Sequence, residues 1–157
     1  MPVLDIYADG SYDAKSQFGS WAFVAFDGEV EVYRARDTSP GTSNNSLEVL
    51  AVIEALAWIA TLDQAQGVVV WTDSRHVVEG CQNWRHIWRN NGWKRIDANP
   101  RARRRSIPDA TAWQRLDSLL GRYPDVTIAW CKGHSGIAGN DQADLLARLP
   151  ADTTKRL

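Results

Sequence analysis

The order in which apolar patterns follow one another constrains the fold of this chain more than any other feature of its sequence. Three short runs with the alternation of a β-strand come first, at residues 3–9, 21–26 and 30–36. Residues 27–28, Asp-Gly, separate the second run from the third, and this dipeptide is typical of a tight hairpin turn. We therefore expect three antiparallel strands at the start of the fold.

Helical and strand patterns alternate in the rest of the chain. Apolar residues recur at helical spacing from Leu47, and the polar run before it supplies N-cap residues for that helix. The other expected elements are strand 68–72, a helical region 74–90, a helix capped by Asp109 and closed by Gly121 and Pro124, strand 126–131 and helix 138–148. This order predicts an α/β fold of the mixed α+β kind, in which helices pack on a mixed sheet.

Length and composition fit one globular domain over residues 1–157. Of the 157 residues, 44% are hydrophobic and 24% charged, which is ordinary for a soluble globular protein. Cys81 and Cys131 are too few for a disulfide framework and lack metal-ligand spacing, which favours a reducing compartment. No export leader or membrane span is evident. We expect a cytoplasmic protein without a membrane partner.

A net charge of −1 conceals a strongly basic segment, residues 84–105. Its basic residues are Arg85, Arg89, Lys94, Arg95, Arg101, Arg103, Arg104 and Arg105, against the single acid Asp97. A local positive patch attracts nucleic-acid phosphates even when the whole protein is neutral. For the arginine-rich stretch 101–105, a solvated loop and a phosphate-binding surface remain equal alternatives.

Three carboxylates follow or begin predicted elements where ligands commonly bind. Asp9 is expected to end the first strand before a turn at Gly10-Ser11, Asp73 ends strand 68–72, and Glu48 lies in the first turn of the helix after the polar run. Acids at two strand ends and on a helix can converge on one crevice, where a divalent cation relieves their repulsion. Oxygen ligands suit Mg²⁺ or Mn²⁺. The alternative for each lone Asp is a cap or a turn.

Four segments resemble the motifs of type 1 ribonuclease H, in the order found in that family. They are residues 7–11 (YADGS), 42–48 (TSNNSLE), 71–74 (WTDS) and 132–144 (KGHSG through GNDQAD), so the resemblance extends over essentially the whole chain. It implies a ribonuclease H-like fold with a five-stranded mixed sheet, three antiparallel strands first and two parallel strands added, flanked by helices. It also implies an endonuclease that hydrolyses the RNA strand of RNA–DNA hybrids, leaving 5′-phosphate and 3′-hydroxyl ends.

The resemblance also implies the catalytic residues. The metal-binding acids would be Asp9, Glu48, Asp73 and Asp144, which would hold two Mg²⁺ ions, with Mn²⁺ as a substitute. In the family's pattern the final Asp is the ligand, which favours Asp144 and leaves Asp141 as a first-turn helix acid. His134 would shuttle a proton or assist product release, whereas a lone loop histidine is more often simply solvated.

Contacts to the hybrid follow from the same resemblance. The residues expected to touch it are Ser43, Asn44, Asn45, Arg75, Arg85, Arg89, Trp93, Lys94 and Arg95, the last five within a basic protrusion at about 84–105. The same Ser and Asn side chains could instead cap a helix, and Arg75 could be an exposed surface residue. For Trp84, Trp88 and Trp113, core packing is favoured over base stacking. Residues 12–19 depart from the Gly- and Pro-rich turn common in bacterial members.

Two other functions remain as alternatives to the hydrolase. One is a hybrid-binding module that keeps the fold without the chemistry, and the other is a resolvase- or transposase-like nuclease that acts on DNA. The complete set of acids argues against the first, and Asn44-Asn45 with the basic protrusion argues against the second. We expect a monomer with no obligatory protein partner. The physiological substrate, the metal preference and the cut-site preference stay open.

Overall fold

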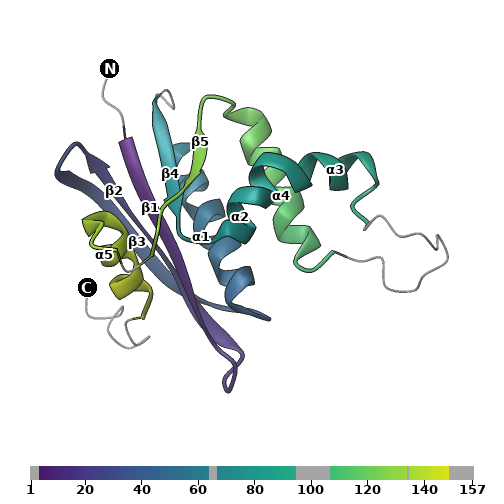
Figure 1. The fold of residues 1–157 in the computed structure, drawn as a ribbon, viewed down its shortest axis with the longest axis horizontal. Helices are drawn as coiled ribbons and strands as arrows, with labels where there is room; N and C mark the ends of the chain where they lie inside the picture. Colours follow the sequence, from purple (N-terminus) through teal and green to yellow (C-terminus); the bar gives the residue numbers. More distant parts are fainter. Residues whose placement is uncertain (1–3, 64–66, 95–106, 134, 149–157) are drawn as a thin grey trace.

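A five-stranded sheet in the order β3-β2-β1-β4-β5 forms the centre of the computed structural model, which describes residues 4–63, 67–94, 107–133 and 135–148 (Figure 1). The strands are β1 (Leu4–Asp13), β2 (Phe18–Asp27), β3 (Val30–Pro40), β4 (Val68–Thr72) and β5 (Thr127–Trp130). The predicted mixed sheet, with three strands first and two added later, is confirmed.

Strand β1 joins the antiparallel and parallel halves of the sheet. It pairs antiparallel with β2, which pairs antiparallel with β3, and it pairs parallel with β4, which pairs parallel with β5. Tyr7 of β1 lies opposite Trp71 of β4. Because parallel strands advance together, Asp9 and Asp73, each two residues further on, reach the same edge of the sheet.

Helices cover both faces of the sheet. They are α1 (Asn44–Ile59), α2 (Arg75–Glu79), a π-helical turn (Gly80–Trp84), α3 (Arg85–Asn90), α4 (Ala110–Arg122) and α5 (Ala138–Arg148). Figure 1 shows α5 apart from α1, α2 and α4, on the other side of the sheet. Among the described residues, no helix is both long enough and apolar enough to cross a bilayer.

Two apolar clusters follow from the alternation of the strands. Ile6 and Ala8 of β1 point into the larger cluster, which includes Val52 of α1 and Trp113 of α4. Tyr7, with the opposite orientation, packs against the smaller cluster between the sheet and α5, made of Ala22, Val24, Ala143, Leu146 and Ala147. Strand β1 is therefore covered on both faces, and its side chains reach two different helical layers.

Strand β1 does not end at Asp9, so the expected turn at Gly10-Ser11 is wrong. The strand continues to Asp13, in unbroken register with β2. Gly10 fits there because α1 approaches the strand closely: a Cβ atom at this position would lie 2.6 Å from the backbone nitrogen of Glu48. The glycine serves a close contact between strand and helix rather than a chain reversal.

The hairpin between β2 and β3 is confirmed, but its loop lies one residue later than predicted. Asp27 pairs with Val30, which leaves Gly28 and Glu29 as the loop. Only Gly28 of these two has a positive φ, of 62°, as the first central position of a type II′ turn requires. The register also shifts between Ala25 and Phe26, which is a bulge within the β2–β3 pair.

Helix α4 differs from the prediction at both ends. Asp109 occupies the N-cap position, but its φ of 59° is left-handed and its side chain does not cap the helix. Its carboxylate instead lies 3.5 Å from the hydroxyl of Thr42, in the segment before α1. Gly121 does not close the helix, because α4 continues to Arg122 and ends before Pro124. The helix limits are set by packing as well as by the local sequence.

Three of the tryptophans form a packed group between the α2–α3 region and α4. Trp113 is fully buried, and the ring of Trp88 lies 5.3 Å from it at 67°. Trp84 lies 5.8 Å from Trp88. Trp113 belongs to the larger apolar cluster and Trp88 packs against it, as the core interpretation predicts, whereas Trp84 is half-buried beside Trp88.

Asp117 of α4 links α4 to α3 through ion pairs with two arginines. Its carboxylate is almost buried and accepts hydrogen bonds from Arg85 at 2.7 Å and Arg89 at 2.8 Å.

We expect Asp117→Ala to lower the free energy of unfolding by about 1–3 kcal/mol, because it leaves the half-buried Arg85 without its carboxylate. Urea denaturation measures the change. The exposed Asp125→Ala serves as the control, and an equal effect of the two variants would contradict this prediction.

Candidate active site

Three carboxylates meet at one edge of the sheet. Asp9 lies on β1, Glu48 on α1, and Asp73 directly after β4. One carboxylate oxygen from each lies within 4.8 Å of the other two. Among the described residues, this is the one group of three or more such side chains that could hold a metal ion. The sequence-based expectation that these acids converge agrees with this geometry.

Glu48 reaches the site because the start of α1 is fixed against β1. Ser43 caps the helix: its hydroxyl accepts from the backbone N–H of Ser46, whose own hydroxyl accepts from the backbone N–H of Ser43. Since α1 starts at Asn44, Glu48 is the fifth helical residue, and its expected place in the first turn is wrong. A hydrogen bond with the side chain of Ser74 holds the Glu48 carboxylate.

Burial and mutual repulsion oppose ionisation of these acids. Burial is the largest cause that raises the pKa of Asp9, from 3.8 to about 8; Asp73, a hydrogen bond with Asp144 and the charge of Glu48 raise it further. Burial also raises the pKa of Glu48, to about 7, against the opposing effect of its hydrogen bond with Ser74. A cation that fits between these oxygens would favour their ionised forms.

Asp144 joins the group through Asp9. The two carboxyl groups share a hydrogen bond, which brings α5 to the same edge of the sheet. Asp144 also accepts from Nε of Arg148, one turn later on α5, at 3.0 Å. Asp141 instead lies exposed in the first turn of α5. The hydrogen bond with Asp9 supports Asp144, rather than Asp141, as the fourth acid.

The arrangement suits a hard divalent cation. The donors are all carboxylate oxygens, they come from three secondary-structure elements, and burial limits their access to water. Mg²⁺ and Mn²⁺ prefer such oxygen ligands, whereas thiolate or imidazole sets would favour zinc or copper. Cys131 lies near Asp9 and Asp73, but burial and these two charges raise the pKa of its thiol to about 11, so it stays neutral.

The polar residues before Glu48 lie at the same end of the sheet as the acids. Besides its capping role, Ser43 is half-buried, whereas Asn45 is exposed. Asn44 accepts a hydrogen bond from the backbone N–H of Tyr12 at 3.0 Å, which ties the helix start to the extended end of β1. Capping and a role in hybrid binding are therefore compatible at this helix start.

The basic residues predicted to contact nucleic acid have different surroundings. Arg85 is half-buried and binds Asp117 and the carbonyl of Cys81, whereas Arg89 is 46% exposed beside the same Asp117. Trp93 has a left-handed φ of 62° and packs against the larger apolar cluster, and Lys94 is exposed. Arg95, residues 101–105 and His134 lie outside the described residues. Contacts from these residues to a hybrid remain predictions.

Three side chains that support the acids escaped the sequence analysis. Ser74 follows Asp73 directly, and Arg148 lies four residues after Asp144 on a predicted helix, so spacing could have indicated both. Trp130 has no such signal, because its role depends on the pairing of β5 with β4. Its indole N–H donates to the carbonyl of Asp73 at 3.2 Å, and its ring lies 4.3 Å from the guanidinium carbon of Arg75.

The chain matches a known protein family over most of its length. The family model described as RNase H matches residues 2–152. A relative named Ribonuclease H from Roseobacter denitrificans is 38% identical over 152 residues, which cover 94% of this chain and 95% of the relative. Another Ribonuclease H, from Jannaschia sp., is 37% identical over 164 residues, which cover 99% of this chain and 98% of the relative.

Solved structures share the fold. The crystal structure of a type 1 RNase H with the type 2 active-site motif is 29% identical, has a TM-score of 0.74, and matches 94% of this chain and 71% of that one. The solution structure of the PFV RNase H domain has a TM-score of 0.76 at 21% identity, over 94% of this chain and 93% of that one. The chain therefore belongs to the ribonuclease H family of endonucleases.

Proposed function

We propose that this chain, as one ribonuclease H domain over residues 1–157, hydrolyses the RNA strand of RNA–DNA hybrids with the help of two divalent cations. The observation that carries the proposal is the convergence of Asp9, Glu48 and Asp73 on one point, with Asp144 hydrogen-bonded to Asp9. These four carboxylates would hold the cations, Mg²⁺ or Mn²⁺. The products would have 5′-phosphate and 3′-hydroxyl ends.

Each of the four acids has a distinct structural support. The bound cations would activate a water molecule and stabilise the departing 3′-oxygen of the scissile phosphate. Asp9 lies within β1 and Asp73 directly after β4, whereas Glu48 and Asp144 come from helices on opposite faces of the sheet. Such a frame keeps ligand oxygens in place before a substrate arrives. His134 is proposed to move a proton or to assist product release.

The surface around the acids supports binding of a hybrid. Ser43, Asn44 and Asn45 offer hydroxyl and amide groups, which can bind base edges and the RNA 2′-hydroxyl in the minor groove. Arg75 would add a further contact, and Arg85, Arg89, Trp93, Lys94 and Arg95 would add sequence-independent contacts from the protrusion at about 84–105. The foamy viral protease-reverse transcriptase, solved in complex with RNA/DNA hybrid, shares this fold at 18% identity and a TM-score of 0.75.

Replacement of one proposed ligand tests the reaction. We expect Asp73→Asn to lower kcat at least about a thousandfold, because several kcal/mol of charge stabilisation from the cations are lost. Cleavage of a labelled RNA–DNA hybrid is measured in Mg²⁺, in Mn²⁺ and in EDTA, with duplex RNA, duplex DNA and single-stranded RNA as parallel substrates. The exposed Asp125→Asn controls for the loss of one negative charge far from the site.

Three outcomes would contradict the proposed reaction. Full activity of Asp73→Asn would show that Asp73 is not a required metal ligand. A hybrid that is bound but uncut in either metal would favour a binding module. Metal-dependent cutting of duplex DNA would favour a DNA nuclease of the same fold.

The raised pKa values predict how the metal-free protein responds to pH. Asp9 titrates near 3.8 when unfolded but near 8 when folded, so its contribution to stability is complete below pH 3.8 and is lost as the pH rises through about 8. We therefore expect the free energy of unfolding in EDTA to fall between about pH 4 and pH 8, and Mg²⁺ to restore it most at high pH. Urea denaturation at several pH values measures both effects.

A matched pair of variants isolates the contribution of Asp9. Asp9→Asn should flatten the pH dependence in EDTA and reduce the stabilisation by Mg²⁺, whereas the exposed Asp27→Asn should leave both unchanged. If the free energy of unfolding of Asp9→Asn depends on pH as strongly as that of the wild type, the buried acid cluster does not cause the pH dependence.

A further inference from the structure

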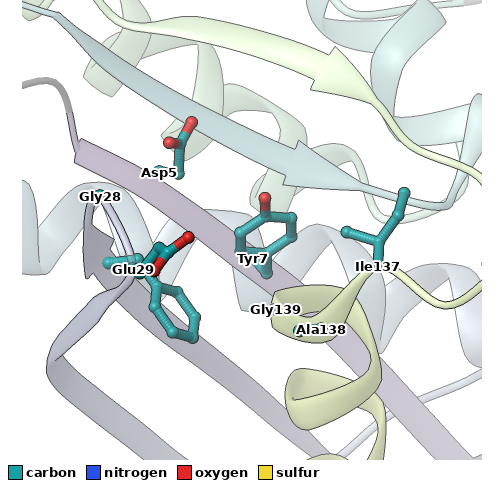
Figure 2. Close-up of a pocket in the computed structure, with 8 residues that line it drawn as sticks. Asp5, Tyr7, Gly28, Glu29, Ile137, Ala138 and Gly139 are labelled. Carbon is teal, nitrogen blue, oxygen red and sulfur yellow. The ribbon is translucent and has the colours of Figure 1, made fainter.

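A pocket of about 380 Å³ lies on the face of the sheet that carries α5 (Figure 2). Tyr7, Phe26 and Ile137 supply apolar surface, and Asp5 and Glu29 supply two carboxylates. We name it the Tyr7 pocket. Its volume is at the lower end of the range of small-ligand sites. None of the residues that line it belongs to the acid cluster described above.

The Tyr7 pocket is acidic without an internal counter-charge. No lining residue is basic, and no ion pair among the described residues involves Asp5 or Glu29. Arg34, one of two arginines in the neighbouring strand β3, pairs with Glu31 and also donates to Gln142. The partial positive charge at the start of α5 is offset by Asp141 in its first turn. A phosphate group would therefore be repelled, whereas a cation would be attracted.

Several contacts hold the pocket in shape before any ligand binds. The indole N–H of Trp71 donates to Asp5 at 2.9 Å, and the Trp71 ring stacks on Tyr7 at 6.3 Å and 15°. Phe26 meets Tyr7 edge to face at 6.0 Å. Gly139 packs directly on the Tyr7 ring, so closely that any side chain there would clash. A ligand would thus meet a preformed site and lose little affinity to reorganisation.

The pocket combines two carboxylates with aromatic rings, and this combination suits an organic cation. In Figure 2, Asp5 and Glu29 lie on one side of Tyr7, and Ile137 and the start of α5 lie on the other. A planar guanidinium can pair with carboxylates and at the same time stack on an aromatic ring, while the methylene stem lies on apolar surface.

We propose that the Tyr7 pocket binds the guanidinium group of an arginine side chain presented by a partner protein. The charge of Asp5 and Glu29, the rings of Tyr7 and Phe26, and the aliphatic surface of Ile137 each match one part of that side chain. The Tyr7 hydroxyl adds an acceptor, and it stays protonated because burial and Asp5 raise its pKa. This proposal does not depend on the hydrolysis proposed above.

The pocket also lies next to the acid cluster along β1. Asp5, Tyr7 and Asp9 alternate along the strand and therefore point to the same face. Helix α5 contributes Gly139 to the pocket and Asp144 to the acid cluster. An arginine in the pocket would contact the same strand and helix that position two of the proposed metal ligands.

Titration of the metal-free protein with a short peptide tests this proposal. The probe is a capped tripeptide, acetyl-glycyl-arginyl-glycine amide, and the matched control replaces arginine by citrulline, its neutral isostere. Two-dimensional ¹H–¹⁵N NMR follows the backbone amides of Gly28 and Gly139 and the indole N–H of Trp71. We expect saturable shifts of these three signals with the arginine peptide at millimolar concentration and none with the citrulline peptide.

Variants of the pocket test whether the charges of Asp5 and Glu29 are responsible for binding of the arginine peptide. Glu29→Gln should weaken binding about threefold or more, the value of a partly exposed ion pair, and Asp5→Asn with Glu29→Gln should abolish it. The exposed Asp27→Asn, in the same hairpin but outside the pocket, should bind normally. The same spectra report whether each variant is folded.

Three results would overturn the proposal. They are equal shifts with the arginine and citrulline peptides, shifts that persist unchanged in the double variant, and shifts that never saturate. Because the titration needs neither metal nor hybrid, its result is separate from the success or failure of the cleavage experiment.

Discussion

The parallel pairing of β1 with β4 is the constraint on which the site depends. It places the end of β4 alongside the middle of β1 and so brings Asp73 next to Asp9. Helices α1 and α5 then approach this edge from opposite faces, with Glu48 and Asp144. The first of these helices is in close contact with β1 at Gly10, and the second packs on the sheet through the smaller apolar cluster.

Burial of the acids suits metal binding but lowers the stability of the metal-free fold. Burial gives the acids a protected, water-poor environment, but the same burial raises the pKa values of Asp9 and Glu48 and makes their charges unfavourable without a cation. The surrounding apolar clusters must supply the stability that the acid cluster lacks. Functional groups often carry such local instability, which the rest of the fold sustains.

Much of the fold and the principal acids could be predicted from the sequence because they depend on local patterns. Strand β4, helix α5 and the cap at Ser43 follow from short-range apolar and capping patterns. The continuation of β1 past Gly10 could not be predicted, because only the approach of α1 explains that glycine. The pairing of Arg85 with Asp117 and the support from Trp130 also arise from tertiary contacts, about which sequence spacing carries no information.

The outer strand β3 bears on how these molecules behave at high concentration. Val30 and Val32 are 65% and 48% exposed on an edge strand, where unpaired backbone groups could recruit a strand from a second molecule. The bulge in the β2–β3 pair and the charged side chains of Glu31, Arg34 and Arg36 disfavour such pairing. The opposite edge, β5, is only four residues long. Both borders of the sheet therefore resist aggregation, by different means.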